Sequence, residues 1–280
     1  MMDILLHLDS YPEPTPLGAI DQAVDFASLF EGRLTALALE VLIRPPTNPL
    51  ANTLINLAGL AAGEQARSAH ACKELTLHFQ ERANARNALA GVVITQADMR
   101  SVGDWVAHHA KTRDACIVPV MNELDGQRSV AEAVIFASGR PVIVFRPGHA
   151  DLPCQGINTV VLAWDNSRTA ARAMADALPL LKRAAKVTVL TVTNEKASAT
   201  PGIGRDVIRH LTLHGVNADI DEIDGGGKSI GATLDVYLER TSCDLLVMGA
   251  YGKSRVREFV LGGATAHVLA RMKVPLFLAH

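Results

Sequence analysis

The residues whose types and spacing could do chemistry gather in one glycine-rich stretch, GAYGKSRVREFVLGGAT, at residues 249–265. It follows directly on the strand-like run CDLLVM. Glycine lets backbone N–H groups approach an anion with no Cβ in the way, and it tolerates positive φ. Gly249 and Gly252 suit that purpose, and they predict a backbone cradle for phosphate oxygens.

The end of the same stretch offers a helix N-terminus. Gly262 and Gly263 immediately precede ATAHVLARM, a helical segment whose free N–H groups and dipole favour a phosphate. Thr265 adds a hydroxyl near its first turn, and Lys253 and Arg255 supply cations between the two pairs of glycines. A plainer interpretation, a flexible turn followed by a helix cap, stays open.

An internal repeat shows which elements would position these residues. The segments DILLHLDS and TVVLAWDNS are apolar runs that close on an acid, Asp9 in the first and Asp165 in the second. Each is followed by an alanine-rich helical stretch and a second aliphatic run, GRLTALALEV ending at Val41 and AKVTVLTVTN containing Val192. Further on, RDACIVPV matches SCDLLVMG, and GRPVIVFRP matches MKVPLFLAH. The matched segments keep the same order in both halves.

The repeat predicts an α/β fold of two tandem, doubly wound parallel-sheet (Rossmann-like) domains with five strands each. Continuous apolar strands bounded by helical patterns are what a parallel sheet buried on both faces requires. We place the first domain at residues 1–148 and the second at residues 157–280, joined by the linker RPGHADLPCQGIN. Such sheets bind ligands at the carboxyl ends of the strands, where the strand order reverses. Gly249 and Asp165 should therefore flank one crevice.

The first half is longer than the second between its second and fourth strands. The interval from Val41 to Asp114 is 73 positions, whereas that from Val192 to Asp244 is 52. The extra piece lies within residues 44–90 and includes IRPPTNPLANTLINLAGLAAGEQ. Its prolines prevent regular structure at the start, and its later part is apolar enough for a packed helix. It is either a lid or interdomain contact, or a surface loop with a lengthened helix; we favour the second.

The composition describes a globular chain with an aliphatic core. Hydrophobic residues make up 49% of the sequence and aromatic residues only 4%. A net charge of −2 leaves no basic surplus to neutralise a nucleic-acid backbone, and no apolar run is long enough to predict a membrane span. The N-terminus lacks a signal-peptide pattern, so we expect a cytoplasmic protein. The cysteines form no CxxC pair and are expected to be free, buried thiols: Cys72, Cys116, Cys154 and Cys243.

The spacing Gly-x2-Gly-x9-Gly, read as Gly249, Gly252 and Gly262, resembles that of the universal stress protein family, in a tandem form with two such domains in one chain. The resemblance covers nearly all of both halves. It implies a fold similar to that of the adenine nucleotide alpha hydrolases, and ATP or another adenine nucleotide as the ligand, with or without Mg²⁺. It also implies that Asp165 and Val192 contact the adenosine, and that the three glycines hold the ribose and phosphates.

Two departures from the family pattern limit these implications. The residue after the third glycine is usually Ser or Thr, but here it is Gly263, with Thr265 two positions later. In the first half, Pro119 and Asn122 stand where the second half has the first two glycines, and proline has no N–H to donate. We therefore expect the first half to be a degenerate domain kept for packing, and one nucleotide per chain.

Three functions of different classes follow. The leading one is a nucleotide-binding regulatory protein of the stress response that acts on an unidentified protein partner. The second is a slow ATPase or nucleotide-transfer enzyme, although no Ser, His and Asp set or spaced carboxylate pair supports a catalytic centre. The adjacent His108 and His109 cannot share a metal as an i, i+4 pair would. The third is a nucleotide-free interaction module, which the missing hydroxyl at Gly263 favours.

The last strand of each half is an apolar edge that must be covered or paired. In the family these terminal strands meet across a two-fold-like axis. We therefore expect PVIVFRP and VPLFLAH to pair within the chain as an internal pseudo-dimer. A homodimer of whole chains stays open.

Overall fold

The computed structural model describes residues 1–44, 56–121, 125–194, 201–251 and 263–280. The first half contains β1 (Asp3–Leu8), α1 (Leu17–Ser28), β2 (Arg33–Leu42), α3 (Leu57–Ala85), β3 (Leu89–Asp98), α4 (Val102–Ala110), β4 (Ala115–Pro119), α5 (Asp125–Ala137) and β5 (Val142–Phe145). The second half contains β6 (Thr159–Ala163), α6 (Arg168–Leu181), β7 (Lys186–Thr193), α7 (Arg205–Leu213), β8 (Ala218–Asp224), α8 (Ile230–Arg240), β9 (Leu245–Gly249), α9 (Ala264–Arg271) and β10 (Leu276–Ala279).

All these strands belong to one ten-stranded sheet with the order β3-β2-β1-β4-β5-β10-β9-β6-β7-β8. Within each half the neighbouring strands are parallel, and both halves repeat one order. The halves join where β5 and β10 pair antiparallel, with Ile143 opposite Phe277. The predicted fold class, with five strands in each half, and the expected pairing of the terminal strands are both confirmed.

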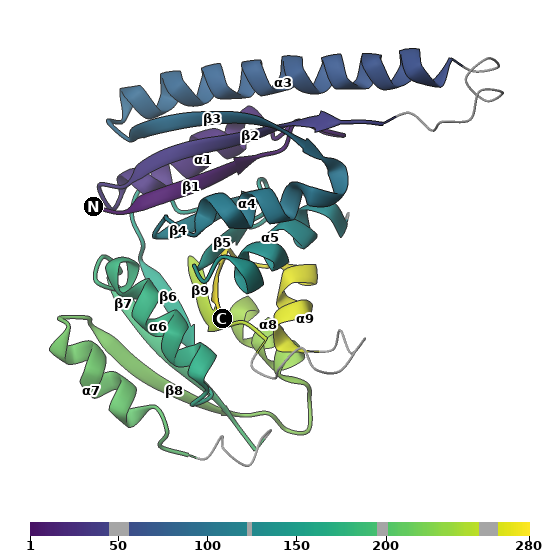
Figure 1. Ribbon diagram of the computed structural model, residues 1–280. Coiled ribbons are helices and arrows are strands. Elements are labelled where there is room, and N and C mark those ends of the chain that lie inside the picture. The colour runs from purple at the N-terminus through teal and green to yellow at the C-terminus, as the bar shows by residue number, and fades with distance from the viewer. Residues whose placement is uncertain (45–55, 122–124, 195–200, 252–262) are drawn as a thin grey trace.

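Two layers of helices cover the sheet (Figure 1). Helices α1, α3, α6 and α7 pack on one face, and α4, α5, α8 and α9 pack on the other. The central strands β4, β5 and β10 are buried along their whole length, as their continuous apolar runs require, and β9 is buried up to its last residue. The outer strands β3 and β8 are partly exposed and carry more polar residues.

The extra piece of the first half is mainly a long helix. Asn56 caps α3 by accepting a hydrogen bond from the Gly59 N–H at 3.2 Å, and the helix continues for 29 residues. The buried side chains of Leu75 and Phe79 lie in the core beneath it, where α3 packs against α1, β2 and β3. The lengthened helix is what the structure shows, and Figure 1 displays it along the outer face of the first half. The proline-rich residues 45–55 lie outside the described residues.

The segment between the halves packs on the first half. The Gln22 side chain of α1 donates to the Asp151 carboxylate at 2.6 Å and accepts from the Leu152 N–H at 3.2 Å. Leu152 and Ile157 are buried in the same core as α1. The predicted linker is therefore held against the fold by specific contacts.

Strand register corrects one match made from sequence. Both first strands begin alike, because Asp114 accepts the Asp3 N–H and Asp244 accepts the Thr159 N–H. These first residues lie opposite Arg33 and Lys186 respectively. Leu39 is six residues after Arg33, and Val192 is six residues after Lys186, so Leu39 is the equivalent of Val192. The match of Val41 with Val192 was therefore wrong by two positions, since aliphatic residues alternate with others in both runs and permit a slip by one pleat.

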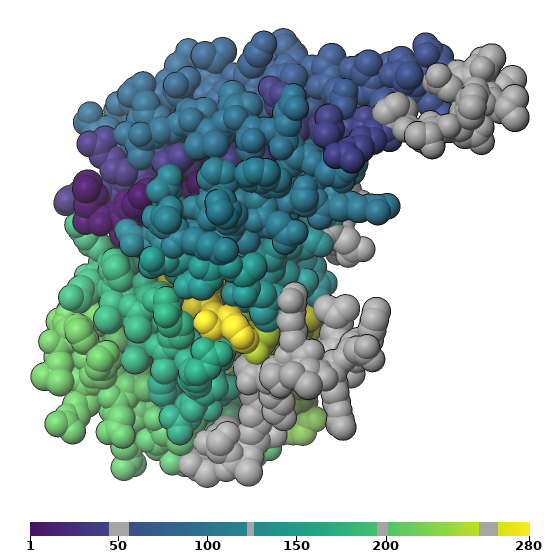
Figure 2. Space-filling view, viewed as in Figure 1, coloured from purple at the N-terminus to yellow at the C-terminus, as the bar shows by residue number. Residues whose placement is uncertain are grey.

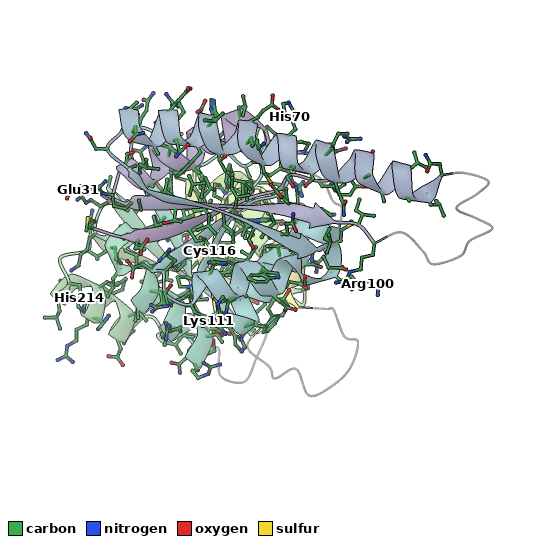
Figure 3. All side chains as sticks on the ribbon, turned by 45° about the horizontal axis from the view of Figure 1, so that its top comes forward. Glu31, His70, Arg100, Lys111, Cys116 and His214 are labelled. Atoms are coloured by element: carbon green, nitrogen blue, oxygen red, sulfur yellow. The ribbon has the colours of Figure 1, made fainter. Side chains whose placement is uncertain are left out.

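The four cysteines are free, as expected, but they differ in exposure. Cys72 and Cys116 are buried, Cys243 is half-buried and Cys154 is exposed, so the expectation of burial was wrong for Cys154. Cys116 lies on β4 in the middle of the sheet (Figure 3). Burial raises the pKa of the Cys72 and Cys116 thiols and raises the pKa of Cys243 to about 11.

Thiol labelling should follow this order. At pH 8 we expect a disulfide reagent to modify Cys154 first. It should react more slowly than a free cysteine, because partial burial and the carboxylates of Asp25 and Asp151 raise the pKa of its thiol and leave less thiolate. Cys116 should react only on unfolding. Peptide mass spectrometry after timed quenching measures both rates, and equal rates for Cys154 and Cys116 in the native protein would contradict the expectation.

Within the described ranges, no helix combines the length and apolar character that crossing a membrane requires. His108 and His109 lie on α4, as predicted, with their rings at 88° to each other.

Candidate functional site

The strand order reverses at two places. β1 and β4 flank the first switch point, and β6 and β9 flank the second. In open α/β sheets, ligands bind outside the carboxyl ends of the strands at such places. The predicted residues Asp165 and Gly249 follow β6 and end β9, two neighbouring parallel strands, so they lie at the same edge of the second switch point.

Asp165 is tied to the start of α6. Its Oδ1 accepts a hydrogen bond from the Ser167 N–H at 3.1 Å, across a turn in which Asn166 has a positive φ of 59°. The Ser167 hydroxyl in turn caps α6 by accepting from the Ala170 N–H at 3.1 Å. This local network fixes the chain path after β6 and places the Asp165 carboxylate beside a helix N-terminus.

At Gly249 the start of α6 packs closely against the end of β9. A Cβ at this position would lie 2.5 Å from both the Ala170 nitrogen and the Thr169 carbonyl carbon. These are backbone atoms, so no side-chain movement could make room. Gly249 therefore has a packing role that the sequence did not suggest. Its role in admitting an anion stays a prediction.

The chain after β9 meets the start of α9. The Ala250 N–H donates to the Ala279 carbonyl at 2.7 Å, and the Tyr251 N–H donates to the Thr265 Oγ1 at 3.2 Å. Thr265 is buried on the first turn of α9, and Gly263 is the extended N-cap of that helix. Among the described residues, no atom lies within 4 Å of the point where a Gly263 Cβ would be. The structure thus brings Gly249, Gly263 and Thr265 to one edge with Asp165.

Val192 lies one strand further, on β7. The neighbouring registers place Leu190 opposite Ala163, and the Trp164 N–H donates to the Leu190 carbonyl at 2.8 Å. Val192 is therefore close to the end of β6, from which Asp165 follows, and its side chain is 8% exposed. The remaining predicted site residues, Gly252, Lys253, Arg255 and Gly262, lie outside the described residues, and so does Asn122 of the first half.

A polar network around the buried Asp235, which sequence reasoning missed, holds α9 against α8. Asp235 accepts from His267 Nε2 at 2.7 Å and from Arg271 Nη1 at 3.4 Å. Gly231 allows the His267 ring to approach, since a Cβ there would lie 2.4 Å from the ring. The network sets the position of the helix that carries Thr265. The i, i+4 spacing of His267 and Arg271 can be read from the sequence, but their shared partner, Asp235 on α8, cannot.

At the first switch point one glutamine connects the chain after β1 to the chain after β4. Gln127, on the first turn of α5, donates from Nε2 to the Asp9 Oδ2 at 3.0 Å and accepts from the Met121 N–H at 2.6 Å. The other Asp9 oxygen contacts His7 Nε2 at 3.0 Å, and the Asp9 N–H donates to Thr15 Oγ1 at 2.8 Å. An amide can satisfy a carboxylate and an N–H at once because it carries both an acceptor and donors.

Next to the first switch point, buried hydroxyl groups connect helix α3 to the end of β2. The Ser10 hydroxyl donates to the Leu39 carbonyl at 2.6 Å and contacts the Ser68 hydroxyl at 2.7 Å. Ser68, fully buried on α3, also accepts from the Val41 N–H at 2.9 Å. Leu39 is the equivalent of Val192, and in the first half buried serine hydroxyls bond its carbonyl and the Val41 N–H.

In the described part of the chain, no group of three His, Cys, Asp or Glu side chains could hold a metal ion. At the end of β8, the Asp224 carboxylate accepts from the Gly226 N–H and from Asn194, each at 2.8 Å. These two bonds lower the pKa of Asp224 below its ordinary value.

Sequence comparison matches the second half of the chain to one family. A sequence profile of the universal stress protein family matches residues 156–280. The universal stress protein Slr1230 of Synechocystis sp. is 27% identical over 125 residues, 44% of this chain, and the match spans only 42% of that relative.

Two solved structures share the fold over nearly the whole chain. One is a universal stress protein from Archaeoglobus fulgidus, with a TM-score of 0.69 at 14% identity, covering 98% of this chain and 95% of that one. The other is a functionally unknown protein from Pseudomonas aeruginosa, with a TM-score of 0.57 at 12% identity, covering 98% and 92%. The second half of the chain, residues 156–280, is therefore a domain of the universal stress protein family.

Proposed function

We propose that this protein binds ATP or another adenine nucleotide at the second switch point, one per chain, and regulates an unidentified protein partner in the cytoplasmic stress response. The contrast between the two switch points carries the proposal. In the first, Gln127 joins the strand acid to the backbone N–H after β4. In the second, the equivalent N–H meets Thr265, a much shorter side chain, beside a glycine N-cap.

Each proposed contact has a physical reason. Asp165 and Val192, which lie at the ends of adjacent strands, are assigned to the adenosine because the resemblance to the universal stress protein family implies that role. The Thr265 hydroxyl and the N–H groups at the start of α9 are assigned to phosphate oxygens, which a helix N-terminus attracts. Mg²⁺, where present, would bind through those oxygens. The remaining residues assigned to the ribose and phosphates are Gly249, Gly252, Lys253, Arg255, Gly262 and Gly263.

Calorimetric titration tests the proposal. ATP, ADP and AMP titrated into the wild-type protein are expected to show one site per chain. Asp165→Ala should weaken the nucleotide that binds best by roughly tenfold, since a hydrogen bond to a charged group is worth about 1.5–3 kcal/mol. Asp9→Ala is the matched control: it removes the equivalent acid of the first half and should leave the affinity unchanged.

Three outcomes would count against it. Absence of heat with every nucleotide, and no thermal stabilisation at millimolar ATP, would favour the nucleotide-free interaction module. Equal affinities for wild type and Asp165→Ala would place the nucleotide elsewhere. Phosphate release above background that Thr265→Ala abolishes would favour a slow ATPase.

A further inference from the structure

Helix α5 of the first half reaches across to the second switch point. The Tyr251 hydroxyl donates to Glu132 Oε1 at 2.7 Å, and the Tyr251 ring lies 4.7 Å from the Phe136 ring, centroid to centroid. Glu132 and Phe136 are both on α5, whereas Tyr251 follows β9. Figure 2 shows the two halves in direct contact, with the yellow C-terminal residues at the seam.

Tyr251 needs such support because of its backbone. It has a φ of 50°, in the left-handed region that residues other than glycine rarely adopt. Its N–H is held by Thr265, so both ends of the residue are fixed by hydrogen bonds. The contacts from α5 therefore stabilise a backbone conformation that residues other than glycine rarely adopt.

The groups around the Tyr251 hydroxyl keep it as a donor. Arg128 Nε donates to the same Glu132 oxygen at 3.1 Å, so this carboxylate also forms an ion pair within α5. Burial and this carboxylate both raise the pKa of the Tyr251 phenol, so it remains protonated. The C-terminal His280 adds a second brace, since its Nδ1 contacts the Ala250 carbonyl at 2.9 Å and its ring lies 5.2 Å from that of Phe136.

We infer that Glu132 and Phe136 are positioning residues for the nucleotide site of the other half. They hold Tyr251, whose N–H donates to the Thr265 hydroxyl, and so fix the end of β9 against the first turn of α9, which is assigned to phosphate oxygens. The inference rests on the proposed function. This inference gives the first half a role beyond packing. Gln127 of α5 contacts Asp9 at the first switch point, and Glu132 of the same helix contacts Tyr251 at the second.

The test removes the hydroxyl or its acceptor and uses two readouts. Tyr251→Phe and Glu132→Ala are expected to speed hydrogen exchange at the residue-251 amide by about tenfold in nucleotide-free protein, and to weaken ATP by about tenfold. Glu132→Gln keeps an acceptor oxygen and should stay close to wild type in both. Tyr237→Phe is the matched control, because its hydroxyl also donates to a carboxylate, Asp221, at 2.9 Å, but within the second half.

The two readouts separate the two ideas. Unchanged exchange at residue 251 in both Tyr251→Phe and Glu132→Ala would overturn the positioning role, and so would a Tyr237→Phe effect as large as theirs. A wild-type protein that binds no ATP would refute the proposed function alone. In that case faster exchange in the two variants would still support the hold that α5 has on Tyr251.

Discussion

Gly249→Ala is expected to lower the free energy of unfolding by about 3 kcal/mol, the upper end of what overpacking a close-packed site costs. The added methyl would lie 2.5 Å from backbone atoms of Thr169 and Ala170, closer than real Cβ atoms approach other groups. Either α6 must move away from the sheet or β9 must bend. Both responses disturb the second switch point, so nucleotide affinity should fall as well.

Urea unfolding followed by circular dichroism measures this loss. Gly263→Ala is the control within the same site, because its Cβ would meet no described atom within 4 Å and its φ of −134° is ordinary for any residue. It should change stability by less than about 1 kcal/mol. Gly63→Ala, on the exposed side of α3, should be neutral or stabilising. Wild-type stability in Gly249→Ala, with nucleotide affinity alone reduced, would show that Gly249 serves only the ligand.

Most of the fold could be predicted because its signals are local and repeated. Apolar runs such as DILLHL and TVVLA mark buried parallel strands wherever they occur, and finding each run twice in one order fixes the topology of both halves. Register was harder. LTALALEV alternates its aliphatic residues so regularly that Leu39 and Val41 are equally good partners for Val192, and only the pairing of strand ends decides between them.

The site could be predicted only where single residues carry the signal. Asp165, Gly249 and Thr265 stand at element ends, so the topology alone brings them to one edge. Gln127 and Ser68 could not be predicted, because each acts through partners on other elements. Gln127 lies 118 residues from Asp9, and Ser68 lies 58 residues from Ser10. No periodicity or spacing encodes such pairs.

The contact between Tyr251 and Glu132, which links the two halves, could not be predicted for the same reason. Tyr251 occupies an unremarkable place between two glycines, and Glu132 an ordinary helix position 119 residues away. Their contact exists because β5 and β10 pair and bring α5 beside the end of β9. A prediction of the strand pairing was possible, but the side chains that meet beside it depend on the angle at which the helices cover the sheet.

The second large loss of stability is expected at the β5–β10 strand pair, the seam where the two halves join. Phe277→Ala is expected to lower the free energy of unfolding by about 3–5 kcal/mol, the usual cost of emptying a buried phenylalanine site. Phe277 is fully buried on β10, opposite Ile143 of β5, in the one described strand pair that joins the halves. The cavity should weaken the coupling between the halves as well as the core.

The two tryptophans allow each half to be followed separately. Trp105 lies on α4 of the first half and Trp164 follows β6 of the second, so Trp164→Phe and Trp105→Phe backgrounds each report one half. In the parent protein the two fluorescence transitions in urea should coincide, because one sheet runs through both halves. With Phe277→Ala they should separate. Phe79→Ala, equally buried but beneath α3 and away from the seam, should cost a similar amount while the transitions stay together. Coincident transitions in Phe277→Ala, with a loss below about 1 kcal/mol, would mean that the β5–β10 pair does not hold the halves together.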